Sequence, residues 1–370
     1  MDFDIKVLQD PIPVDKISEL YEKTYFISYF QSGANSWNSV KYTEWYLGAY
    51  HPDRRFFYSA WKGDQLIATM MGTPVKLKLE NEIELNALSL GLTATLPEFQ
   101  RQGIQKALLT RMIEDATKAG IDFIYGFPEK GFGGNELLKD HFNFKRFLKN
   151  QQHYIKVMGD YGRKILHEYR GLNIVLAKLL KLYAGIPKNV LQGGKIREGK
   201  ESDMKSAVDI INSYQKRMIL SKIWTDERIK YEFEYTSRLK TFDPPWGYHW
   251  KVWERDGKIL ATLFIRFETI NFKNGIAPAT LMSETCFAEE TTVEERAGVI
   301  AHIVRWIRDE HPKIFIVQTT QPQYEIKTFK KLKFIDDTST YEFLVLILSS
   351  KGEELNRYEK YKEFFIPYHR

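Results

Sequence analysis

The chain contains an internal repeat with a period of about 190 residues. Residues 58–69 (YSAWKGDQLIAT) and 251–262 (KVWERDGKILAT) share a plan of strand, two-residue Gly/Asp turn and strand, with a Trp before the turn and an Ala-Thr pair after it. Turns of this composition join antiparallel strands. A second pair, residues 138–144 (LKDHFNF) and 328–334 (TFKKLKF), follows at nearly the same offset. Two matched pairs in register indicate a duplicated domain.

Each half then shows strands and helices in the same order. In the first half we expect strands over 3–9, 56–78, 83–95, 122–127 and 145–156, and helices over 13–25, 42–49, 103–118 and 135–141. In the second half we expect strands over 250–287, 314–319 and 340–348, and helices over 203–216, 292–309 and 324–332. This mixture predicts an α/β fold with an α+β mixed sheet, used twice.

The domain boundaries follow from these elements. We expect an N-terminal domain over 1–157, a connecting segment over 158–194, a C-terminal domain over 195–350 and a tail over 351–370. The connecting segment is amphipathic, with Ile165 and Leu172 on one helical face and Lys164 and Lys178 on the other. A basic amphipathic helix can lie on a membrane surface. A connecting helix packed across both domains has the same pattern, and we favour that interpretation.

Composition excludes several classes of protein. The 370 residues include one cysteine, Cys286, so the chain can form neither an intrachain disulfide nor a cysteine zinc cluster. It has no apolar run of the length needed to span a bilayer, and its N-terminus, MDFDIKV, lacks the layout of a signal peptide. We therefore expect a cytoplasmic protein without a membrane span. The net charge of +6 suits an anionic ligand but does not indicate a nucleic-acid partner. No two histidines lie within one helical turn of each other, so we expect no metal site.

The motif richest in chemistry is residues 92–109 (LTATLPEFQRQGIQKALL). A strand ends at a turn containing Pro97, and a loop containing Gly103 opens an amphipathic helix. Free backbone N–H groups and the positive end of the helix dipole meet at such a loop. Gly103 leaves room for a phosphate to approach, and Arg101 and Lys106 add positive charge. The pattern predicts a phosphate-binding loop.

These residues resemble motif A of the GNAT acyltransferase superfamily, Gln/Arg-x-x-Gly-x-Gly/Ala after a strand. Gln100 and Gly103 match, whereas Gln105 stands where Gly or Ala is usual. The resemblance covers residues 1–157, with a fainter copy over 195–350, and implies two tandem GNAT-like acyl-CoA N-acyltransferase domains. It implies acetyl-CoA or another acyl-CoA as co-substrate, with the pantetheine arm in a splay between strands 83–95 and 122–127. The residues that it assigns to the cofactor are Leu92, Thr93, Ala94, Thr95, Gln100, Arg101, Gln102, Gly103, Ile104, Gln105 and Lys106.

The second copy differs at the corresponding loop. Residues 286–298 read CFAEETTVEERAG, so four carboxylates crowd the start of a helix and no Gln-x-x-Gly remains. Acidic side chains stabilise a helix N-terminus but repel a pyrophosphate. We expect a degenerate domain that binds no cofactor and, by the resemblance, completes the acceptor pocket.

The resemblance also indicates candidate catalytic residues. In relatives, a Tyr in the short helix acts as the general acid, and Lys139 stands at its position here. Tyr125, on the strand expected beside the thiol, is a second candidate proton donor. An exposed structural lysine and a core tyrosine are the alternatives for these two residues. Glu82, Glu84 and Glu129 are candidate bases, each with a solvated carboxylate as its alternative.

The resulting hypothesis is an enzyme, a GNAT-type N-acetyltransferase that uses direct transfer. The acyl group would pass from acetyl-CoA to a primary amine of a small molecule, an amino sugar or a peptide. One alternative is a CoA-binding regulatory or sensor protein on the same scaffold without efficient turnover. Another is an aminoacyl or peptidyl transferase of the tandem type, which predicts a basic groove and strong salt dependence. The small charge excess disfavours the last.

Overall fold

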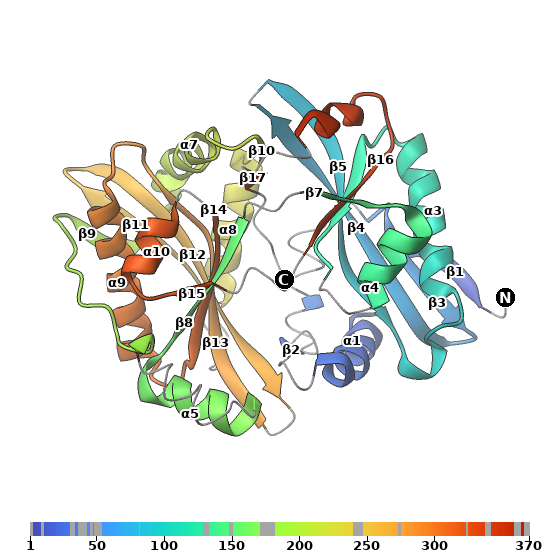
Figure 1. The fold of residues 1–370 in the computed structure, drawn as a ribbon, viewed down its shortest axis with the longest axis horizontal. Coiled ribbons are helices and arrows are strands. Elements are labelled where there is room, and N and C mark those ends of the chain that lie inside the picture. The colour runs from blue at the N-terminus through green and yellow to red at the C-terminus, as the bar shows by residue number, and fades with distance from the viewer. Residues whose placement is uncertain are drawn as a thin grey trace.

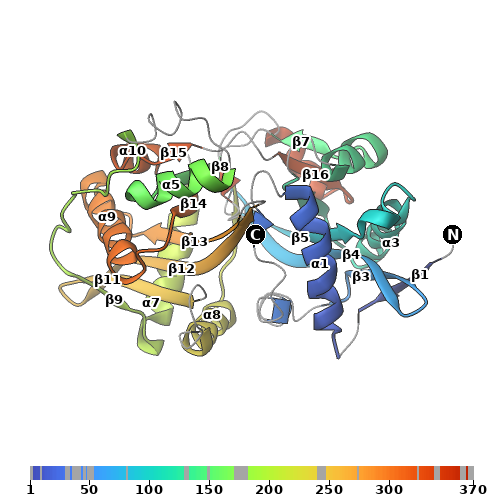
Figure 2. The same cartoon turned by 90° about the horizontal axis from the view of Figure 1, so that it is seen from below.

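A computed structural model of the chain describes residues 3–8, 11–29, 34–35, 43–44, 47, 54–80, 82–128, 133–147, 151–170, 182–239, 247–272, 275–322, 325–336, 342–358 and 364–365. These residues form two lobes, each a mixed sheet flanked by helices (Figures 1 and 2). We call the lobe that contains the loop at Gly103 the N-lobe and the other the C-lobe. The predicted mixed α/β architecture, used twice, is confirmed.

The sheet of the N-lobe has the order β1-β3-β4-β5-β6-β16-β7, with β10 and β17 continuing from the far end of β4. Its strands are β1 (Asp4–Val7), β3 (Phe57–Lys62), β4 (Gln65–Leu79), β5 (Ile83–Thr95), β6 (Phe123–Gly126), β7 (Lys145–Phe147), β10 (Leu220–Lys222), β16 (Phe343–Ile347) and β17 (Phe364–Phe365). Its helices are α1 (Val14–Tyr29), α3 (Ile104–Lys118) and the short α4 (Gly133–Glu136). Strands β5 and β6 are parallel, and their other neighbours along this order are antiparallel.

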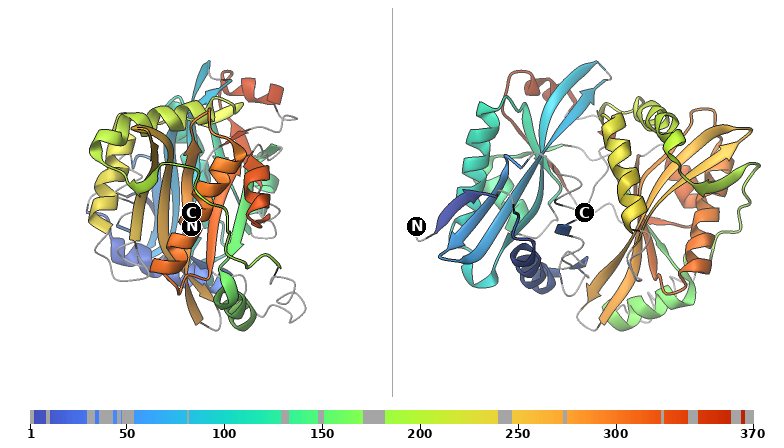
Figure 3. Two further views of the ribbon diagram at one scale, coloured as in Figure 1. Left: turned by 90° about the vertical axis from the view of Figure 1, so that its left-hand side faces the viewer. Right: turned by 180° about the vertical axis from the view of Figure 1, so that it is seen from behind.

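The sheet of the C-lobe has the order β15-β8-β14-β13-β12-β11-β9, with β2 beside the end of β12. Its strands are β2 (Ala34–Asn35), β8 (Gln151–Val157), β9 (Lys195–Glu198), β11 (Gly247–Arg255), β12 (Lys258–Phe272), β13 (Gly275–Phe287), β14 (Ile316–Pro322) and β15 (Ile335–Asp336). Its helices are α5 (Gly159–Arg170), α7 (Met204–Gln215), α8 (Asp226–Leu239), α9 (Val293–Glu310) and α10 (Ile326–Lys331). Helix α8 lies on the side that faces the N-lobe (Figure 3).

The repeat seen in the sequence is visible in backbone detail. The hairpins β3–β4 and β11–β12 have two-residue connections, and both show a register irregularity beside their Trp. The long strands that follow, β5 and β13, each carry a bulge with a left-handed residue, Leu92 (φ 38°) and Glu284 (φ 39°). A bulge adds one residue to a strand and redirects its side chains. Equivalent bulges in equivalent strands support the duplication.

The last strands of the two halves are exchanged. Strand β8, from the first half, lies in the C-lobe between β14 and β15. Strand β16, from the second half, lies in the N-lobe between β6 and β7. The expected domains, 1–157 and 195–350, therefore do not each hold the whole of one sheet. Apolar patterning specifies a strand and its buried face but not its neighbour, and a duplicated fold offers two similar positions.

Two shorter strands cross between the lobes in the same way. Strand β2 pairs with β12 of the C-lobe, and β10 pairs with β4 of the N-lobe. Each half thus contributes strands to the other lobe, so the lobes are not two contiguous segments of the chain. Because separating them would break several ladders, we expect them to unfold together.

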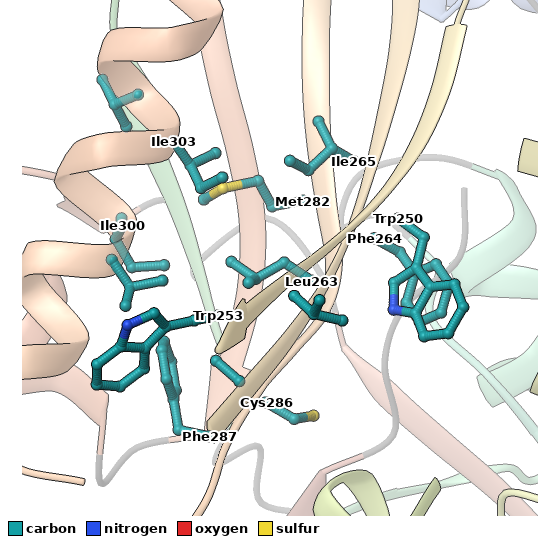
Figure 4. Close-up of a cluster of buried hydrophobic side chains, with 14 of the residues drawn as sticks. Trp250, Trp253, Leu263, Phe264, Ile265, Met282, Cys286, Phe287, Ile300 and Ile303 are labelled. Atoms are coloured by element: carbon teal, nitrogen blue, oxygen red, sulfur yellow. The ribbon is translucent and has the colours of Figure 1, made fainter. Parts of the chain in front are cut away.

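Alternating side chains build the cores. In the N-lobe, Leu88 and Ile124 join the cluster under α1 and α3, whereas their neighbours Ala87 and Phe123 join a cluster on the other face. This alternation is the period of two expected for strands buried on both faces. In the C-lobe, Trp253 packs toward α9 while Trp250 and Phe264 lie on the opposite face (Figure 4).

Part of the connecting segment is helical. Ile165 and Leu166 of α5 are buried in a cluster with Ile270 and Phe315, so α5 packs on the C-lobe. Residues 171–181, with the rest of the predicted amphipathic face, lie outside the described residues. The tail begins with a 3-10 helix, Gly352–Tyr358, whose Leu355 is buried against the N-lobe sheet.

Candidate functional site: the loop before α3 and the β5–β6 splay

The loop between β5 and α3 turns through two left-handed residues. A 3-10 turn over Pro97–Phe99 follows β5, and Arg101 and Gly103 then adopt φ values of 59° and 79°. Gly103 is the N-cap of α3, and a Cβ added there would meet no atom within 4 Å. A left-handed backbone favours glycine, and the open space lets a ligand reach the loop amides.

The N-terminus of α3 is suited to an anion. The first amides of a helix have no intrahelical acceptor, and no side chain caps those of α3. The first turn contains no acidic residue, and Arg101 and Lys106 are exposed beside it. Free amides, a positive helix end and two cations favour phosphate oxygens.

The other predicted loop residues contribute in different ways. Gln102 is exposed and its amide donates to the Glu98 carbonyl at 3.0 Å, while Gln100 donates to the Thr95 carbonyl at 3.3 Å. Ile104 is 2% exposed and packs in the N-lobe core. Only its backbone amide therefore faces the loop.

Gln105, which departs from the motif, turns away from the loop. Its Nε2 donates to the Ala94 carbonyl and to Thr95 Oγ1, both at 2.7 Å, and to the Thr69 carbonyl at 3.2 Å. The side chain therefore fastens the start of α3 to β4 and β5. The Gln105 side chain therefore has a structural role at the position that is usually Gly or Ala, and it does not cap the first amides of α3.

Helix α1 covers the carbonyl groups of the bulged part of β5. The Tyr25 hydroxyl donates to the Thr93 carbonyl at 2.8 Å, and the Thr24 hydroxyl donates to the Thr95 carbonyl at 3.2 Å. Tyr21 donates to the Leu92 carbonyl at 3.4 Å. The sequence singled out Leu92, Thr93, Ala94 and Thr95 but not their partners on α1, because those lie about 70 residues away.

Strands β5 and β6 pair over only a short part of β5. They pair only at Ala87–Phe123, Leu88–Ile124 and Ser89–Tyr125, although β5 continues to Thr95. The ladder thus ends well before β5 does, as the predicted splay requires, and the splay itself stays a prediction. The end of the ladder, which would be the closed end of the splay, is at Gly126, where an added Cβ would lie 3.4 Å from Leu90 Cβ and 3.8 Å from Leu138 Cδ1.

Tyr125 is a core residue at this closed end. It is 2% exposed and packs against the rings of Phe127 and Phe343. Burial raises the pKa of its phenol to about 12, although a hydrogen bond with Ser89 acts in the opposite direction. The hydroxyl thus has a protein partner, which agrees with the core interpretation of this candidate donor.

Lys139 is held by a residue from the other half of the chain. It lies in a π-helical turn, Leu137–His141, and its Nζ forms an ion pair with Glu342, which is 3% exposed. Asn135 Nδ2 donates to the same carboxylate at 2.8 Å, and Arg146 Nε lies 3.3 Å from its other oxygen. Burial alone would raise the pKa of Glu342, but the hydrogen bonds from Lys139 and Asn135 and the nearby cations lower it overall. Glu342 has no local sequence signal, because its partners are some 200 residues away.

Among the described residues, none of the candidate bases lies near the loop. Glu82 and Glu84 lie at the start of β5, the end remote from the loop. Glu129 lies outside the described residues.

The N-terminus of the corresponding helix of the C-lobe, α9, is capped by side chains. The Thr292 hydroxyl accepts from the Glu295 amide, and the Glu295 carboxylate accepts from the Thr292 amide, so a capping box occupies the N-terminus of α9. Glu295 also pairs with Arg255, and the other three carboxylates of this region have cationic partners as well. These pairs are Glu289–Arg217, Glu290–Lys258 and Glu294–Lys331.

Two kinds of feature are absent from the described residues. Over those ranges, no three His, Cys, Asp or Glu side chains gather as a metal site would require. Over the same part of the chain, no helix combines the length and apolar character needed to cross a bilayer.

Comparisons with known proteins agree with this geometry. The family model of the acetyltransferase (GNAT) domain matches residues 19–133. Saccharomyces cerevisiae N-myristoyltransferase with bound myristoyl-CoA superposes with a TM-score of 0.74 at 11% identity, over 93% of this chain and 82% of that one. Residues 19–133 therefore match the GNAT domain model, and the chain as a whole shares the two-lobed fold of that transferase.

More distant folds show the same arrangement. An Enterococcus faecalis protein described as a probable N-acyltransferase has a TM-score of 0.57 at 12% identity, over 95% of this chain and 74% of that one. A GCN5-related N-acetyltransferase from Anabaena variabilis has a TM-score of 0.57 at 8% identity, over 94% and 73%. No curated protein sequence matches the chain.

Proposed function

We propose that this protein is an acyl-CoA-dependent N-acyltransferase with one active site, in the N-lobe. The observation that carries the proposal is the uncapped N-terminus of α3, with left-handed Gly103 beside it, at the mouth of the β5–β6 splay. The loop amides, Arg101 and Lys106 would bind the pyrophosphate of CoA. The pantetheine arm would then follow β5 into the splay, which brings the thioester toward Gly126.

The proposed acyl group is acetyl. The closed end of the splay is packed by Leu90 and Leu138 at Gly126, and by Tyr125, Phe127 and Phe343 on the adjacent face. Such packing favours a short acyl group over a long chain. The acceptor is a primary amine of a small molecule, an amino sugar or a peptide, in a pocket to which the C-lobe contributes.

The reaction is direct transfer. The neutral amine attacks the thioester carbonyl to form a tetrahedral intermediate. The nitrogen then loses a proton to solvent, the C–S bond breaks to complete the amide, and CoA leaves as a thiolate that takes up a proton. The fixed amides and cations of the loop hold the cofactor in place, so positioning supplies part of the rate.

One observation favours a second candidate, a CoA sensor without efficient turnover. Both candidate donors already have protein partners, since Tyr125 is bonded to Ser89 and Lys139 to Glu342. A site without a free acid binds the cofactor well and transfers its acyl group slowly.

Calorimetry followed by a thiol-release assay separates the two. We expect one CoA or acetyl-CoA per chain, and thiol release when an amine panel is added with acetyl-CoA. Binding without release for every amine would favour the sensor, and faster release from myristoyl-CoA would overturn the acetyl assignment. No binding of any acyl-CoA would contradict both.

A further inference from the structure

A buried carboxylate from the second half of the chain lies next to the proposed transfer site. Glu342 comes immediately before β16, the exchanged strand, and its backbone amide donates to the Pro128 carbonyl at 3.1 Å. Pro128 is two residues past Gly126, the closed end of the splay. Because β16 is exchanged, Glu342 lies beside Pro128, just past the proposed closed end of the splay.

Three donors from three elements converge on this carboxylate. They are Asn135 of α4, Lys139 of the π-helical turn and Arg146 of β7. The Lys139 side chain is 34% exposed, whereas Glu342 is 3% exposed. The ammonium is thus paired with a buried anion, while about a third of the Lys139 side chain is exposed. A charge-assisted pair of this kind restricts a long side chain to one orientation.

The same turn touches the splay directly. Leu138, the residue before Lys139, packs over Gly126 at the point where β5 and β6 separate. A π-helical turn is a rare form that occurs frequently at functional sites. The orientation of this turn therefore determines both the wall of the splay and the place of the Lys139 charge.

We propose that Glu342 is a positioning residue of the transfer site, which holds the Lys139 ammonium and its turn at the closed end of the splay. The inference rests on the proposed function. Lys139 then acts as a fixed positive charge near the departing thiolate, where negative charge develops, and Glu342 acts through Lys139. The half of the chain without a cofactor loop thereby completes the site of the other half.

The test is a double-mutant cycle on the full-length protein. Glu342→Gln keeps the size of the side chain and removes its charge, and Lys139→Met keeps the length of the chain and removes the ammonium. We expect each to lower kcat about tenfold with KM for acetyl-CoA and the CoA dissociation constant within about twofold of wild type. The double variant should be no slower than either single variant, because the two residues act as one unit. Glu342→Asp, which keeps the charge, should recover part of kcat.

Glu325→Gln is the matched control. Glu325 is also buried (0% exposed) and ion-paired, with Arg296, but lies in the C-lobe. It should lower the unfolding temperature as Glu342→Gln does, without lowering kcat. Wild-type kcat in Glu342→Gln, equal losses of kcat in both Gln variants, or additive losses in the double variant would overturn the inference. Wild type that binds no acyl-CoA or releases no thiol would instead contradict the proposed function.

Discussion

The two lobes share a fold but differ at the helix N-terminus that follows the bulged strand. Eight residues, 96–103, separate β5 from α3, and five, 288–292, separate β13 from α9. Helix α3 begins after a glycine with no cap, whereas α9 begins with a capping box. The same duplicated helix N-terminus is thus uncapped in one lobe and capped in the other. Backbone amides without an internal acceptor can bind a ligand, whereas amides bonded to a capping side chain stabilise the helix.

The charges follow the same division. The first turn of α3 has no acid and is flanked by exposed Arg101 and Lys106. The start of α9 carries Glu294 and Glu295, each with a cationic partner. A capped and ion-paired terminus gains little from a phosphate and would lose its own hydrogen bonds to bind one.

The largest effect is expected at Gly103. Gly103→Glu places bulk and negative charge over the free amides of α3, so several charge-assisted hydrogen bonds to phosphate are lost together, each worth about 1.5–3 kcal/mol. We expect the CoA dissociation constant to rise more than about 100-fold by calorimetry.

Gly120→Glu is the control for that substitution. Gly120 lies past the other end of α3, is also exposed and left-handed (φ 72°), and has no atom within 4 Å of an added Cβ. The two variants should lose similar stability from backbone strain, but only Gly103→Glu should lose CoA. Near-native affinity in a folded Gly103→Glu variant would refute the cofactor site.

The second prediction concerns stoichiometry. Removing acidic charge from the C-lobe terminus, in Glu294→Gln/Glu295→Gln, should not create a second CoA site, because the shorter loop still lacks a left-handed glycine before α9. Calorimetry should give one site per chain for wild type and variant alike. Two sites in either protein would mean that the two termini are functionally equivalent.

A smaller effect is expected at the cap of α9. Thr292→Ala removes the hydroxyl that accepts from the Glu295 amide and should lower the free energy of unfolding by about 1 kcal/mol, the usual cost of a lost N-cap. Thr292→Ser keeps the hydroxyl and should be near neutral. Chemical denaturation measures the difference, and CoA affinity should not change. A loss of CoA affinity would place a binding role in the C-lobe.

The smallest effect is expected from pH. Burial and nearby cations lower the pKa of His302 and of His311, at the middle and end of α9. The unfolded chain then binds more protons than the folded chain below the ordinary histidine pKa of about 6.5, so stability falls as pH decreases through that range. Unfolding temperatures from pH 7.5 to 5.5 should decline, and less steeply in His302→Asn/His311→Asn. Because exchanged strands join the lobes, a single transition should shift. Two separate transitions would contradict that coupling.

The sequence by itself determined much of this protein. The repeat, the mixed α/β class and the sharp loop before α3 follow from turn chemistry, apolar periodicity and glycine placement, all of which act over a few neighbouring residues. The contrast between the two helix N-termini was also readable, since Gly103 and the four carboxylates of 289–295 differ in their local chemistry. The cofactor role of the loop remains a prediction.

Only the tertiary structure decided which strands lie together. Strand β8 and strand β16 have the pattern of strands in either lobe, and their exchange depends on which edge each meets after the chain has folded. The partners of Gln105, Lys139 and Tyr25 follow from that arrangement, because they join residues from about 10 to about 200 positions apart. Local propensities carry no information on such contacts, whereas packing of the sheets and burial of charge do.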